Sequence, residues 1–228
     1  MRYRYPIALA LISLFMILSC QTTRTPQIPT GIYDPETIAA CNTPFPKSSF
    51  SVVHTMEISM PLGLYSTVVG ITIADVPGKR LRCTLLSPEG LVLFDATLQD
   101  DVTTIHRAVG PLDSEMFAYQ LFSDVRLMFM PDIGESVQSA VRREGRITCR
   151  WKCNSGGLLE CTVDEDGSWT LRLYENDELT KQIDTQGPIT SGFARRILLQ
   201  DLKTAGYSIS LELLEAELIE PSEEMFMP

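Results

Sequence analysis

The chain has 228 residues, with 29 acidic and 19 basic side chains, and its formal net charge at pH 7 is -10. This length corresponds to one ordinary domain or two small ones. The negative field of such a protein repels nucleic acid and anionic lipid head groups, so the composition excludes a nucleic acid as partner.

Residues 1–20 have the pattern of a bacterial lipoprotein signal. Arg2 and Arg4 form a positive start, Ile7 to Leu18 is an apolar run interrupted only by Ser13, and Ser19 precedes Cys20. A membrane span needs roughly 20 apolar residues, whereas the apolar part of a signal peptide needs roughly 7 to 15. We therefore predict that residues 1–19 are a signal peptide cleaved before Cys20; the alternative is an uncleaved signal anchor.

Lipid on Cys20 would hold the mature protein at a membrane. A diacylglycerol anchor on the thiol and a further chain such as palmitate on the new amino group each add about 0.8 kcal/mol per buried methylene. Gln21, rather than Asp, follows Cys20, which by the lipoprotein sorting convention of diderm bacteria indicates the periplasmic face of the outer membrane. We assign residues 20–49 as the lipidated cysteine and a tether, because Gln21 to Gly31 is rich in Thr and Pro.

The opposite end of the chain is acidic. Removal of Arg2 and Arg4 with the signal leaves 209 residues of formal charge -12, and no basic residue follows Lys203. We interpret residues 220–228 as a solvated acidic tail, the alternative being a partner-binding segment.

Residues 50–109 alternate as expected for an antiparallel meander with one dry and one wet face. Turns are predicted at Pro77-Gly78 and Ser87-Pro88-Glu89-Gly90, and a weaker strand at Val102 to Val109. The residues expected to share faces in the first four strands are Phe50, Val52, His54, Met56, Ile58 and Met60; Val69, Ile71 and Ile73; Leu81, Cys83 and Leu85; and Val92, Phe94, Ala96 and Leu98.

The periodicity then changes to that of a helix. Asp113 or Ser114 can cap it, and Pro131 ends it. The apolar stripe that we expect on its inner side consists of Phe117, Leu121, Phe122, Val125 and Met128. A second, shorter helix is predicted from Gly134 to Arg143.

A hairpin follows at Arg146 to Val163. A three-residue loop, Asn154-Ser155-Gly156, with Gly156 in the left-handed conformation, places Cys149 directly opposite Cys161. Five cysteines remain after Cys20, an odd number that allows up to two disulfides in an exported protein. We expect a Cys149–Cys161 disulfide, and Cys153–Cys161 is the rival pairing.

Four further strands close the chain, with breaks at Gln186-Gly187-Pro188 and Thr204-Ala205-Gly206. They are expected at Trp169 to Leu173, Leu179 to Asp184, Arg195 to Leu202 and Tyr207 to Leu214. Leu211 to Leu218 could also form a helix, but the alternation that begins at Tyr207 favours a strand. The fold class is therefore mainly β with a helical excursion.

This order of features resembles the LolA/LolB lipoprotein-carrier superfamily, and within it an uncharacterised family of LolB-like bacterial lipoproteins. The segments that carry the resemblance are Met60-Pro61-Leu62-Gly63, Leu91-Val92-Leu93-Phe94, the helix end from Ser123 to Pro131, and Gly206 to Leu211. It covers most of residues 50–219 and implies a curved antiparallel sheet, an incomplete barrel with helices across its open side. Members hold acyl chains or lipoproteins in this concavity.

The residues offer no catalytic or metal site. His54 and His106 are the only histidines, and a buried core histidine explains His54 better than a ligand or base does. Cys149 and Cys153 lack zinc-site and redox-motif spacing. No nucleophile elbow or phosphate loop is present, so we expect neither an enzyme nor a cofactor.

Two functions remain. The first is an outer-membrane lipoprotein that binds or transfers an acyl chain, polyene lipid or lipoprotein, with Phe117, Leu121, Phe122, Val125 and Met128 as the cavity wall and a periplasmic carrier or assembly protein as partner. The second is a structural or assembly lipoprotein that docks a protein partner and has a packed interior. The turn Asp75 to Lys79 offers only Val76, which departs from the exposed apolar loop of the outer-membrane lipoprotein receptor.

Overall fold

The computed structural model describes residues 35–41, 44–60, 65–154, 156–190, 192–203 and 206–227. The predicted signal peptide, Cys20 and the segment 21–31 lie outside the described residues, as does most of Met60-Pro61-Leu62-Gly63. No helix in the described ranges is long and apolar enough to cross a membrane.

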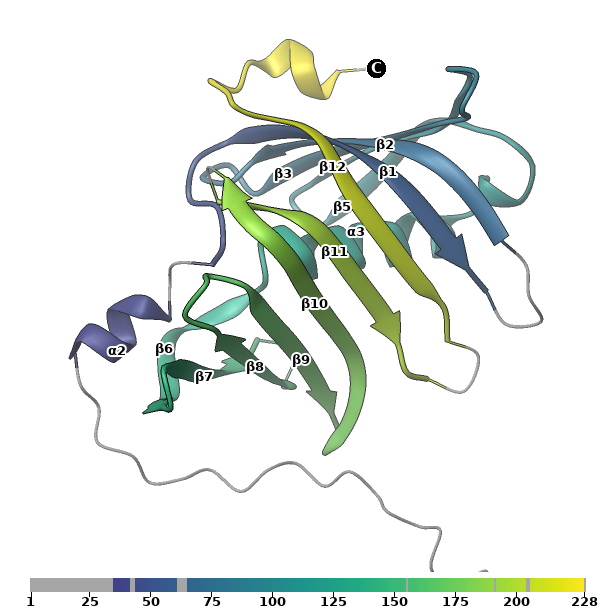
Figure 1. The fold of residues 1–228 in the computed structure, drawn as a ribbon. Helices are drawn as coiled ribbons and strands as arrows, with labels where there is room; N and C mark the ends of the chain where they lie inside the picture. Colours follow the sequence, from purple (N-terminus) through teal and green to yellow (C-terminus); the bar gives the residue numbers. More distant parts are fainter. Residues whose placement is uncertain are drawn as a thin grey trace, which may run out of the picture.

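In these described ranges, twelve antiparallel strands form one open sheet with β5 and β6 at its two edges (Figure 1). All neighbours are consecutive in the chain except β1 and β12, which pair with each other and join the two halves of the sheet. The strands are β1 (Phe50–Ser59), β2 (Tyr65–Asp75), β3 (Arg80–Leu86), β4 (Val92–Gln99), β5 (Val102–Ala108), β6 (Ile133–Arg143), β7 (Arg146–Cys153), β8 (Leu158–Val163), β9 (Trp169–Glu175), β10 (Glu178–Thr190), β11 (Phe193–Asp201) and β12 (Ser208–Leu218).

The predicted inner faces of β1, β3 and β4 are buried except for Ile58 and Val92, which are half-buried, and Met60, which is exposed. Strand β2 turns the other way. Val68, Gly70, Thr72 and Ala74 form its buried face, and the Val69, Ile71 and Ile73 side is only half-buried. The register explains the difference, because Gly70 pairs with His54 next to the inner Met56. A Cβ on Gly70 would lie 2.3 Å from Met56 Sδ, so the absent side chain makes room for a larger neighbour.

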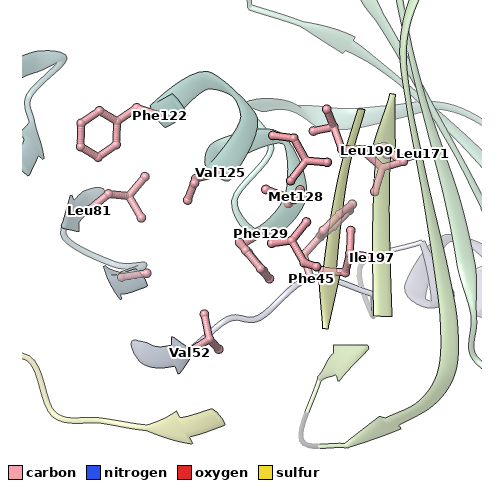
Figure 2. Packing of buried hydrophobic residues seen from close by; sticks show 14 of the residues in the cluster. Phe45, Val52, Leu81, Phe122, Val125, Met128, Phe129, Leu171, Ile197 and Leu199 are labelled. Carbon is pink, nitrogen blue, oxygen red and sulfur yellow. The ribbon is translucent and has the colours of Figure 1, made fainter. Parts of the chain in front are cut away.

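Helix α3 (Glu115–Phe129) connects the two edge strands and follows the short 3₁₀-helix η2 (Gly110–Leu112). Ser114 is its N-cap, and its Oγ accepts a hydrogen bond from Phe117 N at 3.1 Å. Figure 2 shows Val125, Met128 and Phe129 projecting from α3 toward residues of the strands. The Phe129 and Phe50 ring centroids lie 5.6 Å apart, so helix and sheet share one core.

The predicted second helix is wrong, because residues 133–143 form strand β6. Val137 pairs with Trp151 and Ala140 with Cys149, and this pairing satisfies the β6 backbone against an available sheet edge. Residues spaced like Val137 and Ala140 fit either period over so short a segment, and the neighbouring strand decides between the two.

The hairpin β7–β8 has the predicted register, with Cys149 opposite Cys161 and Gly156 at φ 93°. Its second face is only partly wet, because Lys152 is exposed but the charged pair beside it is not. Arg150 and Glu160 are buried and form an ion pair of 2.6 Å, so the polar alternation in this hairpin reflects a buried pair of opposite charges.

The expected Cys149–Cys161 disulfide does not form, because Cys149 is bonded to Cys41. Cys161 is a buried free cysteine, as are Cys153 and Cys83. Cys41 follows helix α2 (Pro35–Ala40), which contacts β6 and β7. A segment 108 residues away in sequence thus supplies the partner, which local register cannot reveal.

The acidic tail is docked on the sheet through 3₁₀-helix η3 (Glu223–Phe226). Arg80 pairs with Glu223 at 2.8 Å and its guanidinium lies 4.5 Å from the centre of the Phe226 ring. Arg82 donates to Met227 O at 2.6 Å. The acidic side chains of the tail are exposed, as predicted, but Phe226 is buried and two arginines of β3 hold the segment at the sheet.

The first of the two predicted breaks and the last strand also take definite forms. Gln186-Gly187-Pro188 lies within β10, where the pairing with β11 shifts register between Gln186 and Ile189. Gly187 has φ 83°, as such a bulge requires. Strand β12 runs to Leu218, which confirms strand rather than helix for Leu211 to Leu218.

Candidate functional site

A hollow of about 430 Å³ lies where the two ends of the sheet face each other beside α3. We call it the apolar hollow. Its walls come from β4 and β5 on one side, from β7, β8 and β9 on the other, and from α3. The side chains that line it are Leu98, Asp101, Thr103, Tyr119, Phe122, Ser123, Arg126, Leu127, Pro131, Asp132, Cys153, Leu159, Leu173 and Glu175.

The predicted stripe on α3 is divided between this hollow and the core. Phe122 lines the apolar hollow. Leu121, Val125 and Met128 are buried and border a void of only about 20 Å³ between α3 and β1, β2, β3 and β12. Phe117 packs edge-on against Phe94, with ring centroids 5.1 Å apart.

Several residues of the apolar hollow were outside the predicted set. Leu98, Leu159 and Leu173 lie on strands that the alternation identifies, but the three strands are distant in sequence. Tyr119 and Leu127 belong to the flanks of α3 rather than to its inner stripe. Sequence periodicity marks such residues as apolar and strand-borne or helical, yet it does not show which strands meet.

The rim of the apolar hollow carries charge. Arg126 of α3 pairs with Asp101 of the β4–β5 turn at 2.7 Å, and Asn154 donates to Asp132 at 2.6 Å. Asp101 is a turn residue with φ 60°, a conformation that Asp tolerates in a tight hairpin turn. These contacts join the helix and both ends of the sheet across the opening.

A second hollow of about 560 Å³ adjoins the first and shares Asp101, Arg126, Pro131 and Asp132 with it. Because of its basic side chains we call it the cationic hollow. Its remaining lining residues are Phe45, Pro46, Lys47, Val76, Lys79, Phe129, Met130, Ile133 and Asn154.

A buried polar cluster fastens α3 at its position. Asp124 accepts hydrogen bonds from Lys181 of β10 and from the hydroxyl of Tyr207, and Gln120 donates to the Tyr207 hydroxyl at 2.9 Å. The Asp124 and Lys181 side chains are 3% and 5% exposed. Burial and the neighbouring Asp124 carboxylate raise the pKa of Tyr207, so its hydroxyl stays protonated and donates.

His54 is buried on the inner face of β1, as predicted. Its ring centroid lies 6.0 Å from that of Phe129, and its Nε2 has no hydrogen-bond partner among the described residues. Desolvation lowers the pKa of His54 to about 4, so the ring is neutral at physiological pH. It borders the small void together with Asp124 and Cys83.

The described part of the chain holds no group of three or more His, Cys, Asp or Glu side chains arranged to bind a metal. The arrangement at the apolar hollow offers apolar contact with a charged rim. Such a surface binds by burial of an apolar group, with polar side chains fixing its orientation.

Comparison with solved structures identifies the fold. A LolA superfamily protein from Nitrosomonas europaea superposes with a TM-score of 0.57 over 87% of this chain and 99% of its own, at 10% identity. A putative outer membrane lipoprotein-sorting protein domain from Vibrio parahaemolyticus superposes with a TM-score of 0.52 over 84% of this chain and 94% of its own, also at 10% identity. A DUF1329 family protein from Desulfovibrio piger superposes with a TM-score of 0.51 over 84% of this chain and 95% of its own, at 11% identity.

No protein-family model and no curated protein matches the sequence. The superpositions confirm the expected resemblance to the LolA/LolB superfamily at the level of the fold. Sequence identities of 10–11% do not assign a function to this chain.

Proposed function

We propose that the protein is a lipid-anchored lipoprotein at the periplasmic face of the outer membrane that binds or transfers a lipophilic molecule. Cleavage of residues 1–19 and acylation of Cys20 would provide the anchor, and residues 50–219 would form a half-barrel with α3 across its open side. The chain passes from edge strand β5 to edge strand β6 through α3, which supports this placement of the helix.

The apolar hollow is the observation that carries the proposal. Its volume of about 430 Å³ falls within the roughly 300–1,000 Å³ of small-molecule sites. Phe122 would contact the ligand, while Leu121, Val125, Met128 and Phe117 would form the adaptable layer behind it. The ligand would be an acyl chain, a polyene lipid or the lipid of a lipoprotein, and no catalytic step is required.

The first test of the proposal is to identify the lipid that the purified protein carries. Protein purified without detergent from its native periplasm, after removal of residues 1–20, is extracted with organic solvent and analysed by mass spectrometry. A lipid or polyene in stoichiometric amount is the expected result. A clean, empty and stably folded protein would count against a carrier.

A matched pair of substitutions then locates the site. Leu173→Asp places a charge in the apolar hollow, whereas Leu198→Asp places one on a half-buried residue of β11 between the buried Ile197 and Leu199, on the opposite side of the strand. We expect Leu173→Asp to lower retention of the extracted lipid about tenfold or more, because burying an unpaired charge costs roughly several kcal/mol. Equal retention by the two variants would contradict this location.

One observation favours the second function. Leu121, Val125 and Met128 border a void of only about 20 Å³, too small for an acyl chain unless α3 moves. A structural or assembly lipoprotein that docks a protein partner would have such a packed interior. Protein that yields no lipid but crosslinks to a specific partner at the outer membrane would support this alternative.

A further inference from the structure

We propose that the lipophilic ligand is an amphiphile with an anionic head group, whose chain occupies the apolar hollow and whose head occupies the cationic hollow. This inference rests on the proposed function and specifies its ligand class. It begins from the contiguity of the two hollows, which share Arg126 and Asp101 from one side and Pro131 and Asp132 from the other.

The cationic hollow departs from the charge of the whole chain. Lys47, Lys79 and Arg126 line it against Asp101 and Asp132, although the full sequence has ten more acidic than basic residues. The ammonium groups of Lys47 and Lys79 form no ion pair with any described residue. They are therefore free to bind an anion.

Both carboxylates of the cationic hollow are already engaged. Asp101 accepts from Arg126, and Asp132 accepts from Asn154. Arg126 neutralises Asp101, whereas Asn154 is uncharged and leaves Asp132 negative, so Lys47 and Lys79 stand against a single carboxylate and the lining has a net formal charge of about +1. An anionic head group at this place is attracted by the two lysines, whereas the net negative charge of the whole protein repels anions elsewhere.

The apolar walls set the orientation of the ligand. Leu98, Leu159 and Leu173 stand in the first hollow, and Lys47 and Lys79 stand only in the second. A chain and a head group separated along one molecule satisfy both, whereas a neutral lipid leaves the cationic end unused. We therefore expect a carboxylate or phosphate at the head.

The test compares a fluorescent long-chain fatty acid with its methyl ester, which has the same chain but no charge. The full-length protein should bind the acid more tightly than the ester. Lys47→Gln combined with Lys79→Gln should weaken binding of the acid about five- to tenfold and leave the ester unchanged. Lys152→Gln, an exposed lysine of β7 outside both hollows, is the matched control and should change neither.

Other results of this comparison would overturn the head-group inference. If acid and ester bind equally, or if the double variant binds the acid like the wild type, the head-group inference is overturned and the proposed function stands. If neither probe binds, the head-group inference is overturned, and the lipid extracted from the native protein decides the proposed function separately. Inorganic phosphate, an anion without a chain, should weaken binding of the acid and leave the ester bound, because it competes only for the cationic hollow; weaker binding of the ester as well would overturn the separate placement of head and chain.

A second inference comes from the cysteines: we infer that the Cys41–Cys149 disulfide can exchange with the thiol of Cys161. Cys161 lies directly opposite Cys149 in the β7–β8 register and is a buried free thiol. Directly opposite residues have Cα atoms about 4.5–5.5 Å apart, which is within the roughly 4.4–6.8 Å spanned by disulfides. Two partners thus compete for one sulfur.

The exchange needs no external oxidant. The Cys161 thiolate attacks Cys149 Sγ, the Cys149–Cys161 bond forms, and the Cys41–Cys149 bond breaks with Cys41 leaving as a thiolate that takes up a proton. Burial and, to a lesser extent, the nearby Glu160 carboxylate together raise the pKa of Cys161 to about 12. The packed protein therefore disfavours the attacking thiolate, and exchange waits for local opening of the hairpin.

Exchange would release the segment that follows α2. Cys41 pins this segment to β7, and Phe45 beyond it packs on Trp169 with ring centroids 5.6 Å apart. Phe45, Pro46 and Lys47 line the cationic hollow. The position of the disulfide would therefore control one wall of that hollow.

Peptide mapping under non-reducing conditions tests the exchange. The full-length protein is held in sub-denaturing urea at alkaline pH, without oxidant, and quenched with an alkylating agent. We expect a Cys149–Cys161 peptide together with alkylated Cys41. Cys161→Ala should abolish both products, and Cys83→Ala, which removes another buried free thiol, should retain them.

Two results would overturn the exchange. One is a wild-type protein whose map contains only Cys41–Cys149 after the hairpin amides have exchanged with deuterium. The other is alkylation of Cys41 at the same rate in wild type and Cys161→Ala, since release of Cys41 would then not depend on the Cys161 thiol.

Discussion

His54 is a neutral, buried ring in an acidic protein, and its Nε2 is unsatisfied among the described residues. The carboxylate beside the same void, Asp124, is bound by Lys181 and Tyr207. Protonation of His54 would therefore bury a cation whose nearest acid is already engaged. This explains why burial dominates and lowers the pKa of His54 to about 4.

This lowered pKa predicts acid sensitivity. The unfolded chain takes up the His54 proton near pH 6.5 and the folded protein only near pH 4, so the contribution is present above the unfolded pKa and is lost as pH falls through that window. The loss amounts to about 3 kcal/mol. Urea unfolding of His54→Leu at several pH values should show a flatter profile by about this amount, whereas His106→Gln should keep the wild-type slope.

Helix α3 is held at the sheet by a charged group as well as by its apolar stripe. Asp124 lies among Leu121, Val125 and Met128, so the stripe contains one buried acid that pattern analysis treats as an exception. Lys181 and Tyr207 come from two different regions of the second half of the sheet. This cluster therefore fixes the helix relative to β10 and β12 with more directional specificity than apolar contact supplies.

Removing one partner of this pair should be costly. Asp124→Asn leaves the Lys181 ammonium buried without a counter-charge, and we expect the free energy of unfolding to fall by about 3–5 kcal/mol. Asp132→Asn, an exposed acid just beyond the helix, should change it by less than about 1 kcal/mol. Equal effects of the two substitutions in denaturant titrations would contradict a fastening role for Asp124.

The tail element is held by two arginines that also stabilise carboxylates of the sheet. Burial alone would raise the pKa of Asp75, but hydrogen bonds from Arg80, Gly78 and Ser49 lower it overall. Arg80 thus serves Asp75 and the tail at once. The tail extends the polar network of β2 and β3 instead of lying free in solvent.

Phe226→Ala should detach the tail without unfolding the sheet. The ring is 9% exposed and lies against Arg80, and its loss removes both buried area and a cation–π contact of about 0.5–1 kcal/mol. Hydrogen exchange monitored by mass spectrometry should then show faster exchange in residues 222–227 alone. Met227→Ala, which removes an exposed side chain, should leave that segment protected.

At the scale of the whole molecule, the sheet is two meanders joined by β1 and β12. This seam brings together residues about as far apart in sequence as the described chain permits, such as Phe50 and Leu218. The edges β5 and β6, by contrast, lie on either side of α3 in sequence. The helical excursion is therefore part of the covalent link between the two edge strands.

Protection from hydrogen exchange should follow this arrangement. β1 has hydrogen-bonded neighbours on both sides, and β5 has one only on the β4 side. Amides of β5 should therefore exchange at least about tenfold faster than those of β1 in the same experiment, because edge strands open locally without disrupting the core. Uniform protection across the sheet would indicate that a further contact covers the β5 edge.

The sequence by itself determined the local features of this protein. Alternation located most strands, Ser114 and Pro131 bounded α3, and Gly156 set the register that places Cys149 opposite Cys161. These predictions are correct because strand and helix periodicity, capping and turn geometry depend on residues that are neighbours in the sequence. The resemblance to the LolA/LolB fold followed from their order along the chain.

Only the tertiary structure decided which distant segments meet. Edge pairing made residues 133–143 a strand, and the inner face of β2 is the one that carries Gly70 beside Met56. Cys149 is bonded to the distant Cys41 and not to the facing Cys161. The hollow likewise needs Leu98, Leu159 and Leu173 from strands far apart in sequence, so only Phe122 of the predicted stripe lines it. Contacts between segments distant in sequence depend on the curvature of the whole sheet, which no local pattern encodes.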